Sequence, residues 1–163
     1  MSLYNSTVLP ARPSAGKEKP MTPDETRERF QREIELRGYD DYYVDRNEER
    51  EILLIATQMG TPLDAAHADL ARVCTERGYV LESAVVKLVR DRIEATVGTE
   101  GRLGRRDFDL ILAAAREVAK AKRTDRQLKT LMVQEMEDTG RTRVRVGWFR
   151  NWYAALKRDL DFA

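Results

Sequence analysis

Few residues in this 163-residue chain could carry out nucleophilic chemistry. It holds one histidine, His67, one cysteine, Cys74, and one serine beyond the first twenty residues, Ser83. A serine or cysteine nucleophile needs a neighbouring base, most often histidine. His67 and Cys74 fall roughly on one helix face, but two side chains are too few for a zinc site. We therefore interpret His67 as a packing or surface residue.

Longer catalytic motifs are also missing from the sequence. It contains no CxxC, HExxH or paired ExxH motif, and its glycines match neither GxGxxG nor a phosphate loop ending in GK[ST]. Carboxylate pairs are plentiful but belong to charged helix faces, which leaves acid/base work by carboxylates alone as an open alternative. The sequence predicts a protein that is not an enzyme and that has no metal ion or other cofactor.

Basic and aromatic side chains interleave near the C-terminus, and a second basic stretch precedes them along the chain. Guanidinium groups pair with phosphates or carboxylates, and aromatic faces stack on nucleic-acid bases. The candidate partner-binding residues of this region are Arg141, Arg143, Arg145, Trp148 and Arg150. For a nucleic-acid partner, the candidate phosphate-contacting residues are Lys120, Lys122, Arg123, Arg126, Lys129, Arg141, Arg143 and Arg145.

The same aromatic residues have a structural interpretation. Trp148, Trp152, Leu156 and Leu160 are spaced four apart, which is typical of a terminal helix that buries one face in the core. On this interpretation the arginines pair with acidic residues of the first half of the chain.

A tyrosine cluster, Tyr39-Asp40-Asp41-Tyr42-Tyr43, lies between the first two predicted helices. Tyrosine is favoured at interfaces because it buries a large area at low entropic cost. Tyr39, Tyr42 and Tyr43 are therefore further candidate partner-binding residues. They could equally attach the first helix to the rest of the domain.

The net charge of +1 hides an uneven distribution. Residues 22–100 carry 11 basic and 18 acidic side chains, whereas residues 101–163 carry 15 basic and 9 acidic side chains. Opposite charge on the two halves favours a non-catalytic helical protein–protein interaction module, such as an adaptor or assembly component, and permits head-to-tail self-association. The alternative function is nucleic-acid binding through the basic C-terminal region.

The segment Gly101-Arg102-Leu103, followed by Asp107-Phe108, resembles the second half of an EF-hand loop over about residues 84–118. In this resemblance Gly101 takes the sharp turn, Leu103 the position that pairs loops, and Asp107 the closing ligand. The first and third ligand positions are Thr96 and Gly98, without carboxylates. The resemblance implies a calcium-free helix-loop-helix unit; the alternative is a generic helix connection with a glycine turn.

The elements that position these residues are predicted to be helices. We expect residues 1–21 to form a disordered tail, because prolines and serines concentrate there without periodicity. Residues 22–163 are predicted to form one all-α domain, a compact bundle of six or seven helices with a short extended or ribbon segment near 141–147. Capping boxes at Thr22/Glu25, Asp45/Glu48 and Thr124/Gln127 open three of the helices, and Thr61-Pro62 opens another in the same way as Thr22.

The cellular setting is predicted from what the chain lacks. One cysteine excludes an internal disulfide framework and fits a reducing compartment. The longest apolar run, residues 52–56, is far shorter than the ~20 residues that span a bilayer. We expect a cytoplasmic protein with no membrane contact.

Overall fold

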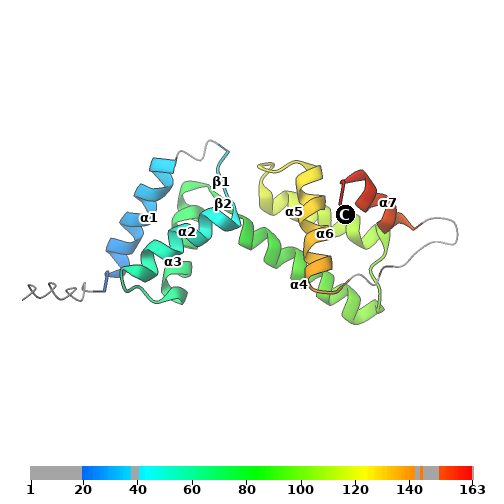
Figure 1. Cartoon of the computed structure of the whole chain (residues 1–163), viewed down its shortest axis with the longest axis horizontal. Helices are drawn as coiled ribbons and strands as arrows, with labels where there is room; N and C mark the ends of the chain where they lie inside the picture. The colour runs from blue at the N-terminus through cyan, green and yellow to red at the C-terminus, as the bar shows by residue number, and fades with distance from the viewer. Residues whose placement is uncertain (1–19, 38–40, 142–143, 145–150, 163) are drawn as a thin grey trace, which may run out of the picture.

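The computed structural model describes residues 20–37, 41–141, 144 and 151–162. In that part of the chain it is an all-α protein of seven helices and one two-stranded sheet, which confirms the predicted fold class (Figure 1). The elements are α1 (Pro23–Arg37), β1 (Tyr43–Val44), α2 (Arg46–Gln58), α3 (Leu63–Arg77), β2 (Val80–Leu81), α4 (Glu82–Glu100), α5 (Arg105–Ala119), α6 (Asp125–Asp138) and α7 (Trp152–Asp159). No helix in the described ranges is long and apolar enough to cross a membrane.

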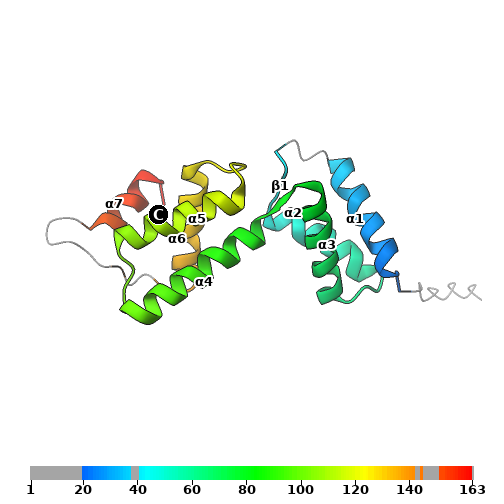
Figure 2. The same ribbon diagram turned by 180° about the vertical axis from the view of Figure 1, so that it is seen from behind.

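The helices gather into two groups, which both views of the ribbon show (Figures 1 and 2). We call α1–α3 the N-terminal helix group and α4–α7 the C-terminal helix group. Each has its own hydrophobic cluster: Phe30, Ile52 and Leu70 belong to the first, and Ile93, Phe108 and Met132 to the second. Helix α4 begins beside the N-terminal group and continues as one wall of the C-terminal group (Figure 2).

The small sheet lies where the two clusters meet. β1 and β2 are parallel, with Tyr43 opposite Val80 and Val44 opposite Leu81. Successive strand residues point to opposite faces. Tyr43 and Val80 accordingly pack into the cluster of the C-terminal group, while Val44 and Leu81 pack into that of the N-terminal group.

Local capping chemistry positions three helix starts as predicted. The Thr22 amide donates to Glu25 at 2.7 Å, and α2 and α6 begin with complete capping boxes at Asp45/Glu48 and Thr124/Gln127. Because each box needs only residues three apart, sequence reasoning finds it without tertiary information.

The prediction that Thr61 caps α3 is wrong. The N-cap is Pro62, which makes no side-chain capping bond. The Thr61 hydroxyl is buried against α1, where it lies 3.1 Å from the hydroxyl of Thr26. The hydroxyl that was expected to cap α3 is used in a tertiary contact with α1 instead.

The extended segment predicted near 141–147 can be followed only in part. Val144 forms a single parallel bridge with Leu103, whose side chain is fully buried. Residues 142–143 and 145–150 lie outside the described residues. The EF-hand resemblance stays a prediction, and Asp107 in its closing position accepts a hydrogen bond from the Gly104 amide at 2.9 Å.

Candidate functional site

The tyrosine cluster and the second basic stretch, two separate candidate binding sets, contact each other at the junction of the helix groups. The Arg123 guanidinium donates to Asp41 at 2.6 Å and lies over the Tyr43 ring, 3.7 Å from its centroid. The ammonium of Lys122 lies 4.7 Å from the centroid of the Tyr42 ring. Such cation–π and ion-pair contacts between segments about eighty residues apart hold the two groups together.

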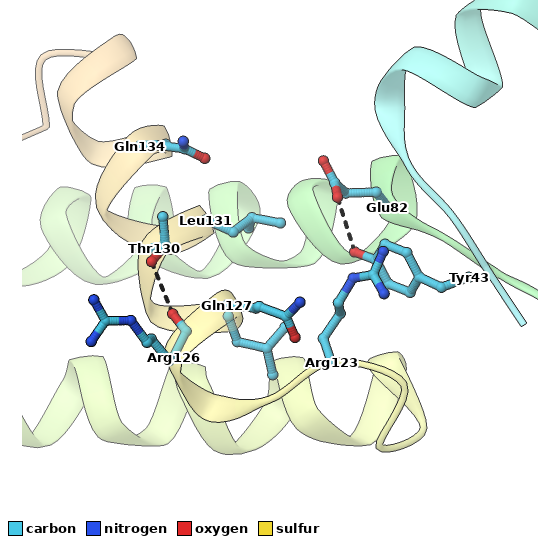
Figure 3. A pocket seen from close by; sticks show the side chains of 9 residues that line it. Tyr43, Glu82, Arg123, Arg126, Gln127, Thr130, Leu131 and Gln134 are labelled. Carbon is cyan, nitrogen blue, oxygen red and sulfur yellow. Dashed lines mark hydrogen bonds between the residues drawn. The ribbon is translucent and has the colours of Figure 1, made fainter. Parts of the chain in front are cut away.

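A small pocket of about 310 Å³ opens beside this contact (Figure 3). The Tyr43 hydroxyl donates to Glu82 at 3.3 Å. Burial raises the pKa of Glu82, which the nearby Arg46 partly offsets, and burial together with Glu82 raises the pKa of Tyr43. Most polar side chains around this pocket already have partners within the chain, which is typical of a structural junction.

Glu135 of α6 forms the second connection between the groups. Its side chain is only 3% exposed, and it accepts hydrogen bonds from Arg46 of α2 and from Arg90 of α4. Burial alone would raise the pKa of Glu135, but the two guanidinium groups outweigh it and lower that pKa. The carboxylate is therefore held ionised between two helices.

The other basic candidates also meet carboxylates. Arg126 pairs with Asp161 at 2.7 Å, and Arg141 pairs with Glu94 at 2.6 Å. Lys120 is exposed at the end of α5, and Lys129 is half-buried on α6. The remaining candidates lie outside the described residues: Tyr39, Arg143, Arg145, Trp148 and Arg150.

The described aromatics of α7 follow the structural interpretation. Trp152 packs against Phe108 with ring centroids 5.5 Å apart, and Tyr153 is buried with its hydroxyl donating to Glu137 at 2.8 Å. Among the predicted tyrosines, Tyr43 is 1% exposed, whereas Tyr42 is 47% exposed and packs on Tyr79.

A larger groove, of about 600 Å³, lies on the N-terminal helix group and the first turns of α4. Each of three helices contributes residues spaced three or four apart, which is one helix face. The lining residues are Arg46, Glu49, Arg50, Leu53, Leu54 and Thr57 of α2, Leu63 and His67 of α3, and Ser83, Val86, Lys87 and Arg90 of α4. We call this surface the α2–α4 groove.

The α2–α4 groove combines apolar side chains with a basic margin. Leu53 and Val86 are buried at its base, whereas Leu54 and Leu63 are 53% and 52% exposed. Exposed leucines that share a hollow with buried apolar side chains typify a binding surface rather than scattered surface apolarity.

Sequence reasoning missed this groove although one signal for it exists. Residues 52–55 are four consecutive apolar residues, which cover about 300° of a helix circumference. One buried stripe needs far less, so at least one of them must face outward. Leu54 is the residue of this run that faces solvent.

His67 and Ser83 both line the groove, but they are not arranged as in a catalytic triad. The Ser83 hydroxyl donates to Oε1 of Glu49 at 3.0 Å, and His67 Nδ1 lies 3.6 Å from the same oxygen. In a hydrolytic triad the histidine stands between the nucleophile and the acid. Here the carboxylate stands between them, an arrangement suited to satisfying a buried Glu49.

Cys74 and His67 differ in their exposure to solvent. Its side chain is buried in the core of the N-terminal group, whereas His67 is exposed. Burial, assisted by the charge of Glu49, raises the pKa of the Cys74 thiol to about 12. Within the described residues no cluster of three or more histidine, cysteine or acidic side chains is arranged to hold a metal ion.

Comparisons with protein-family models, curated proteins and solved structures gave no match to this chain. The candidate site therefore stands on its geometry alone.

Proposed function

We propose that this protein is a helical protein–protein interaction module and that the α2–α4 groove binds a helix of the partner. The observation that carries the proposal is the pair of half-exposed leucines, Leu54 and Leu63, above the buried Leu53 and Val86. Full burial of a leucine yields about 1.5–3 kcal/mol, so covering the exposed half of each side chain against a partner yields about half of that.

The dimensions of the groove fit a helix. The lining face of α2 runs from Arg46 to Thr57, which is about 16 Å at the rise of an α-helix. That length matches about three turns of a bound helix. An amphipathic helix recognised through anchors at i, i+3 or i+4, and i+7 is a recurring mode of peptide recognition.

Nucleic-acid binding, the alternative, has less support in the contacts. Arg123, Arg126 and Arg141 each already bind a carboxylate of the same chain. The Arg126–Asp161 pair is exposed and exchanges readily, but Arg123 and Arg141 are only 20% and 32% exposed, so a phosphate would have to displace a partly buried ion pair to reach either of them. We therefore treat nucleic-acid binding as an outcome of the test.

The test is selection of binders from a helix-display library on the wild-type protein. Most independent clones should lose at least tenfold in affinity on a Leu54→Gln/Leu63→Gln variant. The control is Leu110→Gln on α5, since Leu110 is an exposed leucine away from the groove. Clones indifferent to the groove variant would contradict the proposal.

A parallel titration with labelled DNA and RNA decides the alternative. Binding at about 50 mM salt that collapses at 200 mM salt indicates several phosphate contacts. If Lys122→Glu/Arg126→Glu abolishes that binding and the groove variant does not, nucleic-acid binding replaces our proposal.

A further inference from the structure

We infer that the partner helix of the α2–α4 groove carries acidic residues beside its apolar anchors; this inference rests on the proposed function. Four cationic side chains line the groove: Arg46 and Arg50 on α2, and Lys87 and Arg90 on α4. The one lining carboxylate, Glu49, is buried and already engaged by Ser83. Arg46 and Arg90 are engaged with Glu135, so the exposed cations that a partner meets are Arg50 and Lys87.

The two walls of the groove divide these cations. Arg50 and Lys87 are both exposed, and they come from different helices. Lys87 pairs with Asp91 one turn along α4, an exposed i,i+4 pair that is easily exchanged for another carboxylate. A helix lying between α2 and α4 thus has a cation on each side of its apolar face.

The molecule itself shows this mode of recognition at one end of the groove. Arg46 and Arg90, from the same two walls, together hold the carboxylate of Glu135, which a third helix, α6, presents to them. The same two walls carry Arg50 and Lys87 one turn away from Arg46 and Arg90. A partner carboxylate there would repeat the arrangement that Glu135 makes.

The experiment compares three labelled helical peptides of about 14 residues that share leucines at i, i+4, i+7 and i+11. Their flanking positions are all Glu, all Gln or all Lys. At about 50 mM salt, fluorescence anisotropy should show the Glu peptide binding about tenfold more tightly than the Gln peptide, with the Lys peptide weakest. About 500 mM salt should narrow the difference, because exposed charges are screened.

Charge reversal makes the test specific. Arg50→Glu/Lys87→Glu should invert the order of the Glu and Lys peptides, while Arg106→Glu, on α5 outside the groove, should leave it unchanged. Circular dichroism and thermal unfolding of both variants check that the fold is intact.

The outcomes separate the two proposals. Equal affinity for the three peptides, all lost in Leu54→Gln/Leu63→Gln, would overturn the acidic partner and keep the groove as a helix-binding site. Failure of all three to bind, or binding that ignores Leu54 and Leu63, would overturn both. Two further measurements test other occupants of the groove. If light scattering shows a dimer and Leu54→Gln/Leu63→Gln converts it to a monomer, the groove binds a second copy of the chain. A rise in affinity on deletion of residues 1–19 assigns it to the chain's own N-terminal segment.

Discussion

Tyr43 and Val44 are consecutive residues of β1, yet their side chains lie in different hydrophobic clusters. The paired residues of β2, Val80 and Leu81, divide in the same way. The alternation of a strand thus lets two residues serve two cores at once. The small sheet, although each strand has only two residues, connects the hydrophobic clusters of the two helix groups.

Replacement of the two tyrosines of this region should have unequal effects. Tyr43→Ala empties a buried site, removes the ring under Arg123 and frees Glu82, so we expect a loss of about 3–5 kcal/mol in the free energy of unfolding. Tyr42→Ala, at a half-exposed position, should cost less than about 1 kcal/mol. Urea denaturation of the two variants measures the difference. Equal losses would argue against the burial of Tyr43 in the cluster of the C-terminal helix group.

Removing the negative charge of Glu135 should destabilise the protein at neutral pH. Glu135→Gln weakens charge-assisted hydrogen bonds to Arg46 and Arg90, and we expect a cost of about 2 kcal/mol, since both arginines can still reach water. The folded-state pKa of Glu135 is lowered. Its contribution is therefore complete above the unfolded-state pKa, about 4.3, and is lost as the pH falls through the lower folded-state value.

The measurement is urea unfolding of wild type and Glu135→Gln between about pH 7 and pH 3. The gap between them should shrink below about pH 4. Glu117→Gln, at an exposed position of α5, serves as the control and should cost less than about 0.5 kcal/mol. A gap that does not change with pH would argue against an ionised Glu135 between the two arginines.

Cys74 should resist thiol reagents in the folded protein. The thiol is buried and its pKa is raised to about 12, so both access and the thiolate fraction are low at pH 8. Because Cys74 is the single cysteine of the chain, mass spectrometry after iodoacetamide treatment reports on it alone. We expect labelling to be slow in buffer and complete in urea; rapid labelling of the native protein would contradict the burial.

The α2–α4 groove should bind an apolar anion in the absence of any partner. Anilinonaphthalene sulfonate combines an apolar ring system with a negative charge, which suits exposed leucines beside Arg50 and Lys87. Its fluorescence should fall in Leu54→Gln/Leu63→Gln and persist in Leu110→Gln. Both variants should lose no more than about 1 kcal/mol per substitution, because each of the three leucines is at least half exposed. An unchanged signal in the groove variant would place the dye elsewhere.

Sequence reasoning succeeded where the deciding interactions span a single turn. The capping boxes at Thr22, Asp45 and Thr124 each close over three residues. The same rule wrongly predicted a cap at Thr61, because the Thr61 hydroxyl contacts Thr26, which is 35 residues away in the sequence.

The sequence by itself determined that the chain is helical, where three of its helices begin, and that charge is divided between its halves. These properties follow from hydrogen bonds and periodicities within a few residues of one another. Only the tertiary structure decided that Arg123 stacks on Tyr43 and that Glu135 joins Arg46 to Arg90. It also decided that Leu54 and Leu63 share a groove. Whether two apolar residues on different helices contact each other or stay exposed depends on how the helices cross, and the spacing of residues within one helix does not determine that crossing.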